Sequence, residues 1–351
     1  MYKYGTSRHR PVSLTFLNTP CHPTRPLPDE AQRNSWRLRC SGDSIGALQH
    51  NSFKLALAQM LVEGGRKEEN LRRATDRIQE AAASGAQVVV LPEAMTLGWT
   101  HSSAKREADE VPQDDCCLRL REAARENRIY VCAGLVERAG RLIFNSAVLI
   151  DPSGQVILHH RKLNELEIAH EFYAPGDRLA VASTPLGTLG VMICADAFAS
   201  GQVISRTLGL MGADIILSPC AWAVPADHDN KKEPYGQLWL DNYSPVARDF
   251  RLWIAAVSNV GWLEDGPWNG RKCIGCSLVI GPDGRKVLMG PYGADAEAIL
   301  YTDINLEPRP ARGEGWERLW NADGAHRETA TGARAVPARS TSLGRGGLEN
   351  S

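Results

Sequence analysis

The 351-residue sequence lacks several features that would assign it to a broad class at once. It has 40 lysines and arginines against 41 aspartates and glutamates, so its formal net charge of −1 gives no reason to expect nucleic acid or an anionic membrane as a partner. No stretch approaches the roughly 20 apolar residues that a membrane span needs. The first residues hold no apolar segment of the secretory type, so we do not expect export. With 43% hydrophobic and 23% charged residues, the composition predicts an ordinary soluble protein.

The sequence also lacks the common metal and cofactor signatures: it holds no HExxH, no P-loop and no GxGxxG. Its nine cysteines are an odd number in a long chain, which argues against a disulfide framework and for a reducing, cytoplasmic location. Cys273 and Cys276 have the spacing of half a zinc or redox site. No second CxxC or histidine pair complements them, so we interpret them as structural thiols.

The two ends of the chain differ in composition from its middle. Residues 1–51 are rich in Arg, Pro, Ser and Thr and show no sustained hydrophobic period, so we expect a flexible N-terminal extension. Residues 309–351 are biased toward small and basic residues, which predicts a partly disordered tail. The folded domain is therefore expected over 52–308.

Within this domain the hydrophobic pattern alternates between strand and helix. Residues 86–93 ("AQVVVLPE") form an apolar run closed by proline, typical of a strand buried on both faces. Residues 141–162 predict a hairpin with "DPSG" as its turn. The other strands are expected over 53–60, 129–137, 189–194, 214–220, 252–261, 274–290 and 297–306, and helices over 70–85, 117–128 and 201–211. This alternation predicts an α/β fold, and the hairpins make its sheets mixed.

Three of the expected strands end in a reactive side chain. Glu93 follows "VVVLP", Lys162 follows "VILHHR" and Cys194 follows "LGVMI". Reactive groups collect beyond the carboxyl ends of strands in open α/β sheets, so an acid, a cation and a thiol would form a functional set if they converged. Taken singly, each has an ordinary interpretation: a small buried cysteine, a turn-capping glutamate and a solvated lysine.

The chemistry of such a set is specific. A thiol with a pKa of ~8.5 is largely protonated at neutral pH and needs a base or a nearby cation to become a nucleophile. A buried glutamate can take that proton, and a lysine can stabilise a developing oxyanion. The backbone N–H of Ala195, directly after Cys194, is a natural second donor. Attack by the thiol would give a covalent thioester or thioimidate and release ammonia or an amine.

These segments resemble the nitrilase, or carbon–nitrogen hydrolase, superfamily over residues 53–308. The similar segments, in the family's order, are "LALAQM" to "VVVLPEAM", "HHRKLNE", "GVMICADAFAS" to "GADIILSPCAW", "ARDFRLWIAAVSNVG" and "IGCSLVIGPDGRKVL". The resemblance implies that Glu93, Lys162 and Cys194 are the catalytic base, lysine and nucleophile. It further implies a four-layer α-β-β-α sandwich that commonly pairs with itself, and hydrolysis of a non-peptide C–N bond without metal or organic cofactor.

The resemblance also suggests a second glutamate between the lysine and the nucleophile. Glu165, Glu167 and Glu171 are the candidates; we favour Glu171, which precedes the aromatic–Pro-Gly segment "FYAPGD", with Glu165 as its competitor. Trp222 lies where a pocket wall is expected, although a core tryptophan is nearly as common an outcome. The histidines near the lysine, His159, His160 and His170, receive no catalytic role, and Asp196 is expected to order its turn rather than to react.

Two departures from the family pattern bear on the substrate. The segment "ADAFAS" lacks the W-E-N that typifies nitrilases, which favours an amide or carbamoyl substrate over a nitrile, and it lacks the "FPE" ending of well-known amidase branches. The alternatives are nitrile hydrolysis, glutaminase-like ammonia supply to a partner protein, and a catalytically silent scaffold. We expect loops 98–112 and 223–245 to form the pocket walls around a small linear substrate.

Overall fold

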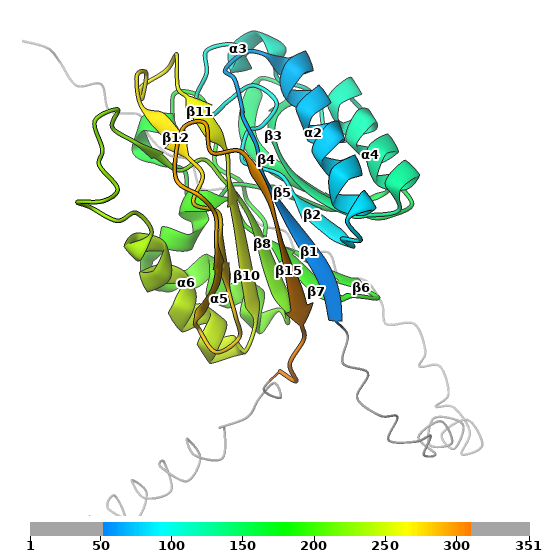
Figure 1. Cartoon of the computed structure of the whole chain (residues 1–351). Coiled ribbons are helices and arrows are strands. Elements are labelled where there is room, and N and C mark those ends of the chain that lie inside the picture. Colours follow the sequence, from blue (N-terminus) through cyan, green and yellow to red (C-terminus); the bar gives the residue numbers. More distant parts are fainter. Residues whose placement is uncertain (1–51, 310–351) are drawn as a thin grey trace, which may run out of the picture. The chain divides into compact units, whose positions relative to one another are not determined.

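The computed structural model describes residues 52–309, and two six-stranded sheets form their centre (Figure 1). The first sheet has the order β15 (Ala298–Asn305), β1 (Ser52–Gln59), β2 (Val88–Val90), β3 (Tyr130–Ala139), β4 (Leu142–Ile150) and β5 (Val156–Arg161). The second has the order β14 (Lys286–Met289), β13 (Leu278–Ile280), β10 (Trp253–Ser258), β8 (Ile215–Cys220), β7 (Gly187–Val191) and β6 (Val181–Thr184). Both sheets are mixed, because parallel pairs at their centres join antiparallel pairs at their edges.

The first sheet lies between a helical layer and the second sheet. In β1, Leu55 and Leu57 belong to the core shared with the second sheet, whereas Ala56 and Ala58 pack in the core shared with the helices. Successive side chains of a strand point to opposite faces, and this alternation gives β1 one face for each layer. The covering helices are α2 (Lys67–Ala83) and α4 (Asp115–Asn127).

The second sheet carries its own helices on its outer face (Figure 1). Side chains of α5 (Val203–Leu210) and α6 (Gln237–Phe250), among them Leu208 and Tyr243, pack in the same core as β8 and β10. The layers therefore follow each other as helix, sheet, sheet and helix, which confirms the predicted four-layer α-β-β-α sandwich.

Helix α6 was not predicted: residues 223–245 were expected to form a loop, but the helix begins at Gln237 and contains Pro245. Proline in a helix interior removes a backbone hydrogen bond and costs about 3 kcal/mol. Burial of Trp239, Tyr243 and Val246 on one helix face offsets that cost.

A third, three-stranded sheet was also not predicted. It has the order β11 (Val260–Trp262), β12 (Lys272–Ile274) and β9 (Ala223–Val224), and two of its strands directly follow β8 and β10. Cys273 lies in β12, and both it and Cys276 are buried. None of the described helices combines the length and the apolar character required to cross a bilayer. The expectations for residues 1–51 and for the tail beyond Arg309 lie outside the described residues.

Candidate active site

Glu93 lies where the chain leaves β2 and reaches the second sheet. Its N–H donates to the carbonyl of Cys220 at 3.2 Å, and the N–H of Gly134 donates to the carbonyl of Pro92 at 3.1 Å. A Cβ atom at Gly134 would lie 2.5 Å from the Pro92 oxygen and 2.6 Å from the Cα of Glu93. Position 134 therefore requires glycine, because any side chain there would displace the backbone that carries Glu93.

Lys162 directly follows β5 and continues its alternation. His160 and Lys162 face inward and are 2% and 1% exposed. His159 and Arg161 face the other way, where both contact the buried carboxylate of Glu137. The sequence "HHRK" thus divides into two inward and two outward side chains, as the two-residue period of a strand requires.

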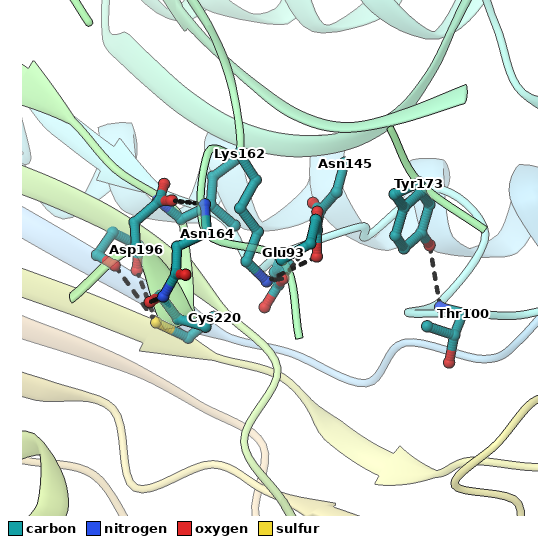
Figure 2. A network of polar contacts seen from close by, with 12 residues as sticks. Glu93, Thr100, Asn145, Lys162, Asn164, Tyr173, Asp196 and Cys220 are labelled. Atoms are coloured by element: carbon teal, nitrogen blue, oxygen red, sulfur yellow. Dashed lines mark hydrogen bonds and ion pairs between the residues drawn. The ribbon is translucent and has the colours of Figure 1, made fainter. Parts of the chain in front are cut away.

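Lys162 and Asn145 converge on the carboxylate of Glu93 (Figure 2). Oε1 of Glu93 accepts from Nζ of Lys162 at 2.7 Å and from Nδ2 of Asn145 at 2.6 Å. Nζ of Lys162 also lies 3.4 Å from Oε2 of Glu165, and the three charged side chains are each 1% exposed. Asn145 was not predicted, although it and Ser146 are the polar residues of the mainly apolar strand β4, which was a usable signal.

This arrangement sets the protonation of the lysine and of Glu165. Burial by itself would lower the pKa of Lys162, but the charges of Glu93 and Glu165 outweigh it and hold that pKa well above its usual value. Burial raises the pKa of Glu165 to about 7, even though Lys162 acts in the opposite direction. The ammonium therefore persists at neutral pH beside one carboxyl group that is partly protonated.

The structure does not bring Glu171, the favoured second glutamate, to the lysine. Glu171 and Glu167 are exposed, whereas Glu165, the competing candidate, lies against Lys162. Beyond Glu165 the chain forms a short 3₁₀ helix, η2 (Glu167–Ala169), and leaves the site. Tyr173, in the aromatic segment that suggested Glu171, is buried and its hydroxyl accepts from the N–H of Thr100, but that anchoring does not bring Glu171 inward.

Cys194 lies in a tight turn rather than at the end of a strand. Strand β7 ends at Val191, and Cys194 begins the 3₁₀ helix η3 (Cys194–Phe198). Its φ of 43° lies in the left-handed region that residues other than glycine rarely adopt. Such a conformation costs on the order of 1–3 kcal/mol and persists where surrounding contacts impose it.

Asp196 supplies many of those contacts. Its Oδ1 accepts from the N–H groups of Leu163 and Asn164 at 3.0 and 2.8 Å, while Oδ2 accepts from the N–H of Ile193 at 2.9 Å and lies 2.8 Å from Nε2 of His160. Burial alone would raise the pKa of Asp196, but the His160 contact and the backbone donors outweigh it and lower that pKa. The carboxylate thus joins the turn that carries the cysteine to the segment that carries the lysine (Figure 2). His160, to which no role was given, is part of this link.

The thiol of Cys194 is held in its neutral form. Burial raises its pKa well above the usual value, and the neighbouring thiol of Cys220 and the charge of Glu93 act in the same direction. Lys162 opposes the shift, as predicted for a cation, but does not outweigh burial. The thiol needs a base before it can act as a nucleophile.

A cavity of about 210 Å³ brings together all the predicted site residues except Glu171. Glu93, Lys162, Cys194 and Ala195 line one part of it, and Trp222 lines its wall. The aromatic members of the wall are Trp99, Phe198, Trp222, Tyr235, Trp239 and Trp268. Segments 98–112 and 223–245 both line the cavity, but the second is a loop only up to Gly236, and Leu238 and Trp239 reach the wall from helix α6. The contribution of Trp268 was not foreseen.

The family model for carbon-nitrogen hydrolases matches residues 54–309. The chain belongs to the carbon-nitrogen hydrolase family. It is a hydrolase that acts on C–N bonds. Among curated family members, a nitrilase of Pyrococcus abyssi is 31% identical over 258 residues, which cover 72% of this chain and 90% of the relative. The omega-amidase NIT2 of Xenopus tropicalis is 29% identical over 267 residues, which cover 73% of this chain and 89% of the relative.

Solved structures of family members share the fold. A carbon-nitrogen hydrolase from Helicobacter pylori superposes with a TM-score of 0.62 at 23% identity, covering 81% of this chain and 99% of that chain. An amidase from Nesterenkonia sp. superposes with a TM-score of 0.61 at 23% identity, covering 79% of this chain and 100% of that chain. The resemblance to the nitrilase superfamily and its fold is thereby confirmed.

Proposed function

We propose that the chain is a thiol hydrolase that cleaves an amide or carbamoyl C–N bond of a small substrate through an acyl-enzyme on Cys194. The observation that carries this proposal is the cavity in which a buried thiol, carboxylate and ammonium meet. Burying three such groups together costs free energy unless they are paired, so the arrangement favours chemistry over a scaffold role.

In the first step Glu93 takes the proton of the Cys194 thiol while the sulfur attacks the carbonyl carbon of the substrate. A base is required because the raised pKa keeps the thiol protonated. The ammonium of Lys162 and the N–H of Ala195 stabilise the negative charge that develops on the carbonyl oxygen. The contacts of Lys162 and Asn145 with Oε1 orient the base.

In the second step the protonated Glu93 gives its proton to the leaving nitrogen, the C–N bond breaks, and ammonia or an amine departs. Water then attacks the thioester with Glu93 again as base, which releases the acid and restores the thiol. Glu165 is a positioning residue in this scheme, because its contact with Lys162 acts on the reaction through the lysine.

Nitrile hydrolysis is the second candidate, since the Pyrococcus abyssi relative is named a nitrilase. The amide remains our preferred substrate because the segment after the nucleophile, 195–200, lacks the tripeptide typical of nitrilases. Ammonia supply to a partner would use the same chemistry with a glutamine-like amide.

The proposal includes a homodimer and a cytoplasmic location. Val203 and Leu210 lie seven residues apart on α5 and are 56% and 66% exposed, so a second copy that packs along this helix would bury both. Light scattering tests the dimer, and a monomer at micromolar concentration would contradict it.

Ammonia release from a panel of small amides, nitriles and carbamoyl compounds tests the chemistry. We expect wild-type turnover of at least one amide and its loss in Cys194→Ala, with circular dichroism to verify the fold. Cys117→Ala, a substitution of a buried cysteine in α4, is the matched control and should retain activity. Release that survives Cys194→Ala would contradict the mechanism.

A further inference from the structure

We propose, on the basis of the function proposed above, that the acyl group of the substrate is uncharged and apolar, with one ring or a short branched chain. Amides that carry a second, anionic carboxylate would then be poor substrates. The inference rests on the charges, the ring contacts and the size of the cavity.

The cavity wall offers no spare positive charge among residues 52–309. Its charged members are Glu93 and Lys162, and both lie at the reacting part. Nζ of Lys162 already contacts two carboxylates, Glu93 at 2.7 Å and Glu165 at 3.4 Å. A carboxylate on the substrate would therefore enter an apolar wall without a partner, which carries a large desolvation penalty.

One cationic side chain contacts a residue of the wall but does not itself line the cavity. The guanidinium of Arg271 stacks over the ring of Trp268 at 4.5 Å from its centroid, but Arg271 does not line the cavity. Trp268 lines the cavity and Arg271 does not, so the wall has an aromatic side chain rather than a charge at this position.

The aromatic side chains are held by one another. Trp222 stacks on Trp239 with centroids 4.4 Å apart and an interplanar angle of 26°, and Phe198 lies 4.5 Å from Trp239. Trp99 lies 4.9 Å from Trp268. Such surfaces favour hydrocarbon and aryl groups through dispersion and ring contacts.

The buried hydrogen-bond donors of the cavity wall carry no charge. The indole N–H groups of Trp99 and Trp222 are buried and have no hydrogen-bond partner among the described residues. An indole N–H can satisfy an uncharged oxygen, but it supplies no positive charge to balance a carboxylate. The volume of about 210 Å³ is below the roughly 300–1,000 Å³ of pockets for drug-sized ligands, which limits the acyl group to modest size.

A matched pair of amides tests the inference. Succinamate and 4-methylpentanamide have the same two methylene groups after the amide carbon and differ in whether a carboxylate or an isopropyl group follows them. In 3-phenylpropionamide a phenyl ring takes that place. We expect kcat/KM for 4-methylpentanamide and 3-phenylpropionamide to exceed that for succinamate by on the order of 100-fold.

A positive charge placed at the mouth of the cavity should reduce the preference for apolar amides over succinamate. Leu238 lines the cavity and is 57% exposed, so Leu238→Arg can be accommodated at its mouth. We expect Leu238→Arg to shift the kcat/KM ratio toward succinamate by at least about tenfold. The control Leu118→Arg, on α4 outside the cavity and at a site 47% exposed, should leave the ratio unchanged.

The outcomes separate this inference from the proposed function. Wild-type preference for succinamate, with Cys194-dependent turnover, would overturn the apolar substrate class and leave the hydrolase intact. Loss of that preference in Arg271→Gln would then identify Arg271 as the carboxylate's partner. An unchanged ratio in Leu238→Arg would also contradict the inference. Absence of turnover for every amide and every carbamoyl compound of the panel would overturn the proposed function and, with it, this inference.

Discussion

The reacting part of the cavity and its aromatic wall differ in the contacts that hold their side chains. At the reacting part, charged groups face one another or backbone donors: Lys162 contacts Glu93 and Glu165, and Asp196 contacts three backbone N–H groups and His160. Glu165 is held by the charge of Lys162 alone, because its two oxygens accept no hydrogen bond among the described residues. In the wall, the side chains contact one another through rings, and two indole N–H groups have no partner among the described residues. This difference indicates that the charged groups of the reacting part determine the reaction, while the shape and polarity of the wall select the substrate. Changes at the reacting part should therefore slow all substrates alike, whereas changes in the wall should alter their ratio.

The largest effect is expected for Lys162→Met, which removes the ammonium and keeps an apolar side chain of similar length. Loss of oxyanion stabilisation and of the partner of Glu93 should lower kcat/KM by on the order of 10³-fold or more, equally for 4-methylpentanamide and succinamate. Steady-state kinetics with both amides measure this. Lys67→Met removes a partly buried lysine that pairs with Asp109, and this control should retain activity. Near-normal turnover in folded Lys162→Met would refute the role of the ammonium.

Gly134→Ala tests whether the placement of Glu93 matters. The added Cβ collides with the backbone of Pro92 and Glu93, so the end of β2 must move. We expect kcat/KM to fall by roughly 10–100-fold, because displacement of a catalytic group by about 1 Å has effects of that size. Gly140→Ala, at a hairpin position with nothing within 4 Å of its Cβ, should lose some stability but no activity. Equal activities of the two variants would count against the requirement for glycine at 134.

The smallest effect on turnover is expected for Glu165→Gln. This substitution should mainly change how the free energy of unfolding depends on pH. Because burial raises the pKa of Glu165 from 4.5 to about 7, the folded state retains a proton that the unfolded state loses first. The stabilisation that comes from this retained proton is fully present below pH 4.5. It is lost as the pH rises to about 7, which lowers the free energy of unfolding by up to about 3 kcal/mol. The free energy of unfolding of the wild type, minus that of Glu165→Gln, should fall over this interval in urea titrations. A difference that is independent of pH would show that Glu165 is not buried with a raised pKa.

The layered fold and three residues of the site could be predicted from the sequence because both follow from local patterns. The apolar run before Glu93 and the alternation that leads to Lys162 place both side chains at strand ends, where reactive groups of α/β sheets meet. Ordered segments similar to one family then connected these positions to Cys194. The predicted fold and the predicted family were both confirmed.

The remaining features depend on long-range contacts. Glu165 reaches Lys162 because the backbone between them is bound by Asp196, a contact across 32 or 33 residues, so spacing along the chain did not distinguish it from Glu171. Asn145 reaches Glu93 across 52 residues. Helix α6 forms in spite of Pro245 because the second sheet buries one of its faces.

The most direct test of the central claim is to locate the acyl group during turnover. Wild-type protein is mixed with 4-methylpentanamide, quenched in acid, digested and mapped by mass spectrometry, with ammonia release followed in parallel. The account predicts a 4-methylpentanoyl thioester on Cys194 and no ammonia release in Cys194→Ala. An acyl group on a different residue, such as the neighbouring Cys220, or undiminished release in Cys194→Ala, would contradict it.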